Sequence, residues 1–152
     1  MLNKKFYIAE TKDKGKGLFA IKEIKKGELI FIHKDGKIYD EKDFESSGLR
    51  EDHFMQIGWN KFLYIHPPGC YGNHSCNPNM GRKGKKTFAL KNIKKGEELT
   101  LDYDTFEYDW VMKCKCKSKN CRKTLRGYKH LPEKLKKKYK GYIAKYLLKA
   151  PK

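Results

Sequence analysis

The sequence lacks any long apolar run: none of its 152 residues belongs to an uninterrupted stretch of the roughly eighteen apolar residues that a membrane span needs. A basic-then-apolar secretory leader is also missing. We therefore expect no membrane partner and an intracellular, cytoplasmic location. Aromatic residues make up 13% of the chain, which argues against disorder, and the length suits one domain with an ordinary core.

Acidic residues are nearly absent from the last part of the chain. Residues 113–152 hold 16 Lys and Arg residues against Glu133 alone. Such a segment would attract nucleic acid or another polyanion. Arginine, however, accounts for only four of the 36 basic residues, and phosphate recognition favours arginine. Nucleic-acid binding and a merely solvated, lysine-rich surface therefore both stay open.

A near-repeat divides the rest of the chain. Phe19–Glu28 recurs as Phe88–Glu97 with few changes. Each copy predicts a short strand, a basic turn that contains a glycine, and a second strand, at Leu29–Ile32 in one case and Leu99–Tyr103 in the other. Two copies are too few for a solenoid, so we expect two similar β-units that face each other in one domain.

The remaining pattern is mostly β with short helices. Further strands are predicted at Phe6–Ile8, Gly17–Ala20, Met55–Ile57, Phe62–Ile65 and Thr87–Leu90. Asp40–Leu49 predicts a short helix that is acidic in its first turn. Residues 131–148 carry an apolar stripe at helical spacing, with Pro132 at a first helical position, and predict a C-terminal helix packed on the domain.

Three motifs stand out, in this order: Gly72-Asn-His-Ser-Cys-Asn-Pro-Asn79, Gly96-Glu-Glu-Leu-Thr-Leu-Asp-Tyr103, and Cys114-x-Cys116-x4-Cys121. Together they resemble the SET-domain family of protein lysine methyltransferases over roughly residues 5 to 126. The resemblance implies a fold of several small sheets with a knot-like segment. It also implies a catalytic domain at 1–112 and a post-SET zinc tail at 113–126. The basic helical extension at 127–152 lies beyond the family's usual tail and rests on the charge and apolar spacing of this chain alone.

In that family the cofactor is S-adenosylmethionine, bound by a Gly-x-Gly loop and an Asn-His pair. From the residues alone, these motifs also fit a tight turn and a capped turn. The resemblance assigns cofactor binding to Lys16, Gly17, Leu18, Tyr71, Asn73 and His74. Many members carry Arg-Phe-(Ile/Leu) before the Asn, whereas this chain has Cys70-Tyr71-Gly72, so one cofactor contact from arginine is missing.

Tyr103 is the expected catalytic residue by the same resemblance, whereas a tyrosine at a strand end is otherwise a core-edge residue. Its hydroxyl would orient the sulfonium methyl and the attacking amine. The target lysine, with a free pKa of about 10.4, must be neutral to attack, and burial beside a sulfonium lowers that pKa. Leu101 occupies a position where many members carry Phe or Tyr, so the number of methyl groups added stays open.

The five cysteines argue for metal rather than for disulfides, because no secretory leader accompanies them. Cys114, Cys116 and Cys121 supply three thiolates, and a structural zinc site needs four ligands. The resemblance supplies the fourth from Cys76. Cys70 is left over as a small buried apolar residue. A redox pair of Cys114 and Cys116 is the alternative.

The acids gather in two segments: seven lie between Asp35 and Asp52, and six between Glu97 and Asp109. By the resemblance both segments border the substrate groove, so an acidic mouth would attract a lysine-rich peptide. Solvated surface charge is the simpler alternative. Phe106 and Trp110 would line the lysine channel or contact the adenine of the cofactor; packing alone is the alternative.

These features predict a protein-lysine N-methyltransferase that transfers methyl from S-adenosylmethionine to a lysine ε-amine in a basic protein such as a histone. Action in the nucleus, or in a host's nucleus, would follow from a histone target. The first alternative is a non-catalytic SET-fold module that holds nucleic acid or nucleosomes through its basic tail. The second is a zinc-dependent interaction protein with unrelated chemistry. The oligomeric state stays open.

Overall fold

The computed structural model describes residues 4–34 and 36–149 and contains five small sheets in these ranges. The first pairs β1 (Phe6–Glu10) with β2 (Lys16–Ala20), antiparallel. The second has the order β3 (Leu29–Ile32), β9 (Lys86–Ala89), β8 (Met80–Lys83). The third has the order β4 (Ile38–Tyr39), β6 (Lys61–Tyr64), β5 (Phe54–Gly58).

The last two sheets are pairs of two-residue strands. β7 (Asn73–His74) runs parallel to β10 (Thr100–Leu101), and β11 (Met112–Lys113) runs antiparallel to β12 (Thr124–Leu125). The α-helices are α1 (Glu41–Ser46) and α2 (Glu133–Lys138). Short 3₁₀ helices lie at Glu51–His53, Gly69–Tyr71, Tyr103–Thr105, Tyr128–His130 and Lys145–Lys149.

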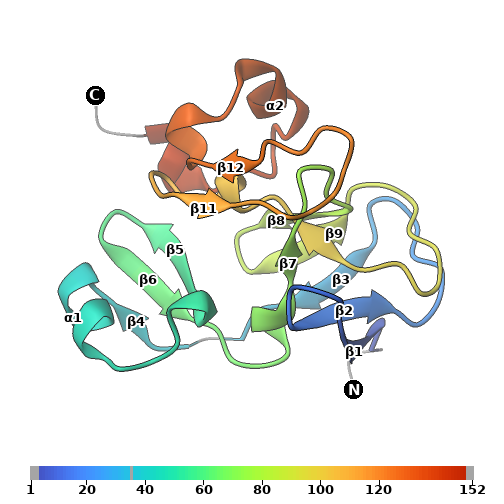
Figure 1. Cartoon of the computed structure of the whole chain (residues 1–152), viewed down its shortest axis with the longest axis horizontal. Helices are drawn as coiled ribbons and strands as arrows, with labels where there is room; N and C mark the ends of the chain where they lie inside the picture. Colours follow the sequence, from blue (N-terminus) through green and yellow to red (C-terminus); the bar gives the residue numbers. More distant parts are fainter. Residues whose placement is uncertain (1–3, 35, 150–152) are drawn as a thin grey trace.

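The predicted mostly-β architecture is confirmed. In Figure 1 the sheet β4–β6–β5 with α1 forms one side of the molecule, and the sheets of β1–β3 and β8–β9 form the other. The β11–β12 pair and the C-terminal segment cover both from above. One core joins both sides, since Met55 of β5 and Leu63 of β6 belong to the same buried cluster as Leu18, Met80 and Leu99. Within the described ranges no helix combines the length and apolar character needed to cross a membrane.

The near-repeat forms two β-units that face each other, as the sequence predicts. Ile24 and Ile93 exchange both backbone hydrogen bonds, at 2.9 and 2.8 Å. The hydrogen bonds on either side of this pair are also reciprocal between the two copies of the repeat. The Gly27 N–H donates to the Ala89 carbonyl and the Gly96 N–H to the Ala20 carbonyl, each at 2.8 Å. Every bond thus has a counterpart 69 positions along the chain, which makes the pair a local pseudo-twofold unit.

Helix α1 is shorter than the predicted span of Asp40–Leu49. Asp40 caps its first turn, because the carboxylate accepts the Asp43 N–H at 2.8 Å. The acidic residues Glu41 and Asp43 lie in that turn, where the helix dipole favours negative charge. The helix ends before Gly48, whose φ of +67° is outside the helical region.

The C-terminal segment is not the single helix that the apolar stripe predicts. Helix α2 stops after Lys138, and Gly141 takes a φ of +89°, which breaks the helical path. A 3₁₀ turn at Lys145–Lys149 follows. The stripe nevertheless packs inward, with Tyr139, Ile143 and Leu147 buried together. The segment is fastened to the domain where the Ala144 N–H donates to the Thr105 carbonyl at 2.9 Å.

Candidate functional site

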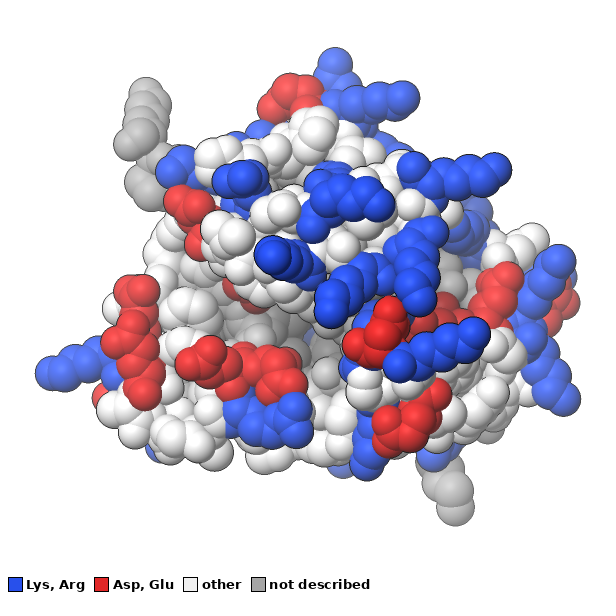
Figure 2. Space-filling model, viewed as in Figure 1, with Lys and Arg blue, Asp and Glu red and all other residues white. Residues whose placement is uncertain are grey.

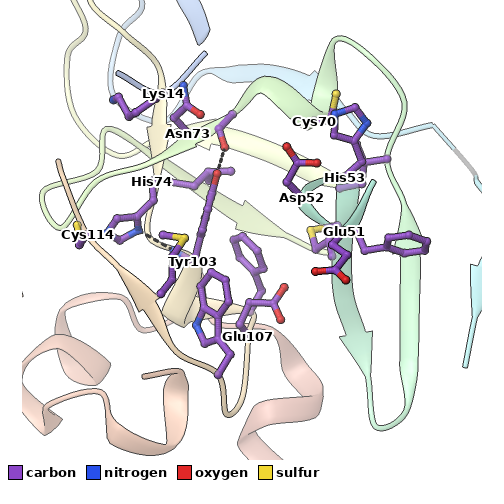
Figure 3. Close-up of a pocket in the computed structure, with 18 of the residues that line it drawn as sticks. Lys14, Glu51, Asp52, His53, Cys70, Asn73, His74, Tyr103, Glu107 and Cys114 are labelled. Atoms are coloured by element: carbon purple, nitrogen blue, oxygen red, sulfur yellow. Dashed lines mark hydrogen bonds between the residues drawn. The ribbon is translucent and has the colours of Figure 1, made fainter. Parts of the chain in front are cut away.

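A cavity of about 370 Å³ lies where the sheets meet the cysteine-rich tail. Asn73 and His74 of β7, together with Leu101 and Tyr103, form one wall. Residues 51–55 form the opposite wall, and the tail at residues 112–116 closes a further side. Figure 3 shows Tyr103 facing Asp52 and Glu51 across this space. The structure thus brings residues from all three sequence motifs to one cavity, the third through Cys114 and Cys116.

Tyr103 begins a 3₁₀ turn directly after β10, which orients its side chain along the cavity. Its hydroxyl donates to the Gly72 carbonyl at 2.8 Å, and its backbone N–H donates to His74 Nδ1 at 3.2 Å. The ring packs against Phe106 and Trp110, with centroids 5.6 and 6.0 Å away. Burial, with a smaller contribution from the Glu107 charge, raises the pKa of Tyr103, so the hydroxyl is neutral at physiological pH.

Asn73 ties the glycine loop to β10. Its amide donates to the Lys16 carbonyl and to Glu98 Oε1, each at 3.0 Å. A Cβ built on Gly17 would lie 3.2 Å from Asn73 Nδ2 and 3.0 Å from Glu98 Oε1. Lys14 completes the group through a 2.8 Å ion pair with Glu98. Glycine is therefore needed at position 17 by the close packing of the loop on the Asn-His segment.

The predicted cofactor residues are placed unequally. Lys16, Gly17, Tyr71 and Asn73 lie together, since the Lys16 ammonium sits 5.6 Å above the Tyr71 ring and its carbonyl holds Asn73. Two of the six predicted residues, Asn73 and His74, line the cavity. In the glycine loop, the cavity is lined by Lys14 and not by the predicted Lys16. Leu18 is fully buried in the core, so its side chain serves packing.

His74 is held by contacts within the chain. Its Nδ1 accepts the Tyr103 N–H, so in the neutral ring Nε2 carries the hydrogen. Burial, aided by the charge of Arg122, lowers the pKa of His74 to about 3, which keeps the ring neutral. Its Nε2 lies 3.3 Å from Cys76 Sγ. His74 therefore links the Tyr103 backbone to the cysteine cluster.

The cysteine cluster has the composition of a structural metal centre. The ligand atoms of His74, Cys76, Cys114 and Cys116 lie within 4.8 Å of one another. Cys121 packs on the same cluster, with its thiol 3.8 Å from the Cys114 carbonyl. Backbone N–H groups of three residues point at the sulfurs: Cys76 at Cys116 (3.5 Å), Arg122 at Cys76 (3.3 Å) and Lys123 at Cys121 (3.4 Å). Such donors stabilise thiolates.

The pKa values of these thiols are also consistent with a structural metal centre. Burial raises the pKa of Cys76 to about 11 and raises that of Cys114 further. Burial alone would also raise the pKa of Cys116, but hydrogen bonds from Ser118 and from the Cys76 N–H lower it to about 6. A bound cation is what allows several thiolates to share one buried site.

An ion-pair network that the sequence did not reveal lies beneath the tail. Arg122 donates to both carboxylate oxygens of Asp102, at 2.9 and 2.7 Å, and to Asp104 Oδ2 at 3.0 Å. Asp104 Oδ1 also accepts the indole N–H of Trp110 at 3.0 Å. Asp102 and Asp104 are 1% and 2% exposed, so the expectation that the acids of 97–109 form the mouth as a group is wrong for these two.

Other acids do face the cavity. Glu51, Asp52 and Glu107 line it. Figure 3 shows Glu51 and Asp52 across the space from Tyr103, whereas Glu107 lies on the same side as Tyr103, whose carbonyl accepts the Glu107 N–H at 2.9 Å. Burial raises the pKa of Glu107 to about 7, against the opposing effects of the Gln56 N–H and the Arg82 charge. We call Glu51, Asp52 and Glu107 the acidic wall. Cys70, expected to be buried, is half-buried and also lines the cavity.

A family model described as "SET domain" matches residues 15–104, which is more than half of the chain. A histone-lysine N-methyltransferase of Mycosarcoma maydis, named as H3 lysine-36 specific, is 34% identical over 139 aligned positions, which cover 79% of this chain and 14% of that protein. A putative histone-lysine N-methyltransferase of Arabidopsis thaliana, ASHH4, is 32% identical over 140 positions, which cover 80% of this chain and 40% of that protein. The chain therefore spans less than half the length of these relatives.

Two solved structures share the fold. One is KRYPTONITE in complex with mCHG DNA and SAH, with a TM-score of 0.62, 22% identity, and 81% of this chain and 29% of that chain covered. The other is the methyltransferase domain of human SETMAR, with a TM-score of 0.62 and 23% identity; the match covers 80% of this chain and 58% of that chain. The chain belongs to the SET-domain family, as its motifs, fold and relatives agree.

Proposed function

We propose that the protein is an S-adenosylmethionine-dependent protein-lysine N-methyltransferase. The observation that carries this proposal is the position of Tyr103, whose neutral hydroxyl lies in the cavity with the Asn73-His74 segment beside it and with Glu51 and Asp52 opposite. The cofactor supplies the methyl group as an electrophilic sulfonium. Asn73, His74 and the glycine loop with Lys16 and Gly17 are the groups available to hold it.

The protein's part in this reaction is positioning. Because the Tyr103 hydroxyl donates its hydrogen to Gly72, its lone pairs are free to accept from a target amine. Phe106 and Trp110 enclose the space beside the tyrosine ring and exclude water. Desolvation in such a cavity lowers the pKa of a lysine, which favours the neutral, nucleophilic amine. In-line placement then lowers the barrier without a dedicated general base.

The acidic wall supports a basic protein as the substrate. Glu51, Asp52 and Glu107 would attract the lysine ammonium and its basic neighbours toward the cavity. The relatives named above carry histone lysine in their names, and we propose a histone-like, lysine-rich protein for this chain as well. Action in the nucleus would follow from that choice of substrate.

We further propose that the tail binds one structural zinc ion through Cys76, Cys114, Cys116 and Cys121. His74 lies among these sulfurs, but its Nε2 carries a hydrogen and cannot coordinate a metal at the same time. It acts instead as a hydrogen-bond donor to Cys76. Zinc there would hold the tail over the cavity and favour thiolates at all four positions.

The experiment is transfer of labelled methyl from S-adenosylmethionine to a panel of basic proteins, comparing wild type with Tyr103→Phe. We expect Tyr103→Phe to bind cofactor normally and to lose activity by about 10²–10³-fold, the usual effect of removing one positioned donor or acceptor. Tyr7→Phe, at an exposed site on β1, is the matched control and should retain activity. Wild-type protein that binds cofactor but transfers no methyl would contradict the proposal.

The alternative is a non-catalytic binding module for nucleic acid. Figure 2 shows Lys and Arg gathered over the tail and C-terminal segment, and acids mostly below the central hollow. Lys113 and Lys115 carry this basic surface to the rim of the cavity. Electrophoretic mobility shifts with duplex DNA, repeated at rising salt, measure this property independently of methyl transfer.

A further inference from the structure

A second cavity, of about 630 Å³, lies on the other side of Phe106 from Tyr103. It is bounded by the sheet β4–β6–β5, by the β8–β9 hairpin and by residues 141–146 of the C-terminal segment. Nothing in the proposed methyl transfer uses it. Its volume lies in the range of small-molecule sites, which is about 300–1,000 Å³.

The lining combines apolar walls with positive charge. Ile38, Ile57, Leu63, Phe106 and Ile143 supply most of the walls. The charged residues that line it are Arg82, Lys83, Lys85 and Lys145. Among the lining residues that the structure describes there is no aspartate or glutamate. A ligand that fits this lining is an anion with an apolar body.

Arg82 is a half-buried cation that makes no direct ion pair within the described residues, although the charge of Glu107 acts on it from nearby. One Nη donates to the Gly84 carbonyl at 3.0 Å, the other contacts the Met55 sulfur, and the guanidinium lies 5.2 Å from the Phe106 ring centre. Its Nε is buried and has no hydrogen-bond partner. Within residues 4–34 and 36–149, no acid lies within ion-pair distance of Arg82. Burial lowers the pKa of Arg82 to about 10, and the nearby charge of Glu107 offsets this only in part. An anion bound in direct contact would stabilise the buried guanidinium further.

His33 lies between the two cavities, lines both, and supplies a second unpartnered polar group. The side chain is 7% exposed, and its Nε2 makes no hydrogen bond. Burial, together with the charge of Arg82, lowers the pKa of His33 to about 3, so the ring is neutral and close enough to Arg82 to feel its charge. A neutral imidazole donates one hydrogen bond without adding to the buried charge.

We propose that this cavity binds a fatty-acid-like carboxylate, with its head group at Arg82 and His33 and its alkyl chain along the isoleucine-lined wall. Inorganic phosphate would leave the apolar wall uncovered, and a neutral lipid would offer Arg82 no carboxylate in direct contact. The proposal does not depend on methyl transfer, because it concerns different residues and is measured by binding alone.

The experiment is a titration of the whole protein with dodecanoate, kept below its micelle concentration and followed through isoleucine methyl resonances. We expect saturable shifts at Ile57 and Ile143 and none at Ile8 and Ile21, which are exposed elsewhere on the molecule. Dodecanol, which lacks the charge, and phosphate, which lacks the chain, should each bind at least about tenfold more weakly, since a charged hydrogen bond contributes about that factor.

Arg82→Gln should weaken dodecanoate binding at least about tenfold, whereas Arg126→Gln, at an exposed arginine away from the cavity, should leave it unchanged. If Arg82→Gln does not fold, the comparison of the three ligands on wild type decides alone. Dodecanoate that causes no saturable shift, shifts both isoleucine sets alike, or binds no tighter than dodecanol or phosphate would overturn the proposal. So would unchanged affinity in a folded Arg82→Gln variant.

Discussion

Replacing Arg122 by glutamine tests whether the tail and the catalytic segment form one unit. The substitution removes three charge-assisted hydrogen bonds, two to Asp102 and one to Asp104. Asp102 would then be a carboxylate that is almost fully buried without a countercharge. Removing one partner of a buried pair costs about 3–5 kcal/mol. Asp104 keeps its bond from Trp110, so we expect a cost of about 3 kcal/mol, at the lower end of that range.

The assay is urea unfolding followed by circular dichroism. With a slope of about 1–3 kcal/mol per molar urea, a cost of this size lowers the midpoint by about 1–3 M. Arg50→Gln is the matched control, because Arg50 also makes two hydrogen bonds to one carboxylate, that of Asp52. Those side chains are 70% and 61% exposed, so water replaces the lost contacts and the midpoint should not move.

A second variant separates charge burial from loss of packing. Adding Asp102→Asn to Arg122→Gln removes the uncompensated carboxylate, so the double variant should recover part of the lost stability. An Arg122→Gln protein that unfolds at the wild-type midpoint would refute the idea that this network fastens the tail. A double variant less stable than Arg122→Gln would assign the loss to packing instead.

The other predictions concern the metal, one acid and one glycine. Cys121→Ala should lower zinc content, measured by mass spectrometry of the purified protein, whereas Cys70→Ala should not. Glu107 has a folded pKa of about 7, above its unfolded 4.5, so it stabilises the fold below about pH 4.5 and that contribution is lost as pH rises through 7. Glu107→Gln should flatten this part of the stability–pH curve, and an unchanged curve would contradict the assignment. Gly127→Ala should destabilise the protein by several times more than Gly27→Ala in thermal unfolding, because both have positive φ but only at Gly127 would the Cβ overlap a neighbouring carbonyl. Equal melting temperatures for these two variants would refute the steric overlap at Gly127.

The sequence predicted the features that depend on local patterns. The repeated Lys-Lys-Gly-Glu turns predicted two facing β-units because a glycine with positive φ and a flanking strand are local properties. The cysteine spacing predicted a cluster of three tail thiols, and the family resemblance placed that cluster beside Cys76 of the Asn-His segment. The two-residue strands β4, β7, β11 and β12 were missed, since so few residues carry no periodic signal. The four-residue strand β8 was missed as well.

Features that depend on distant partners could not be predicted in this way. Asp104 looked like a surface acid, and only the approach of Arg122 in the folded tail shows that it is buried and paired. The apolar stripe of residues 131–148 predicted burial correctly but a helix incorrectly, because Gly141 turns the chain. That glycine was a visible signal, and helix propensity alone argued against a continuous helix through it.

The reciprocal bonds between Ile24 and Ile93 also bear on how the chain folds. Neither β-unit can satisfy its backbone groups without the other, so each must wait for a partner 69 residues away. Closing so long a loop carries an entropic cost before any contact compensates it, which slows folding. Asn73 and Cys76 lie inside that loop. We therefore expect Asn73, proposed to bind cofactor, and Cys76, proposed to bind zinc, to be held in place only after the two halves of the repeat have met, and a fragment that ends before Phe88 should not fold.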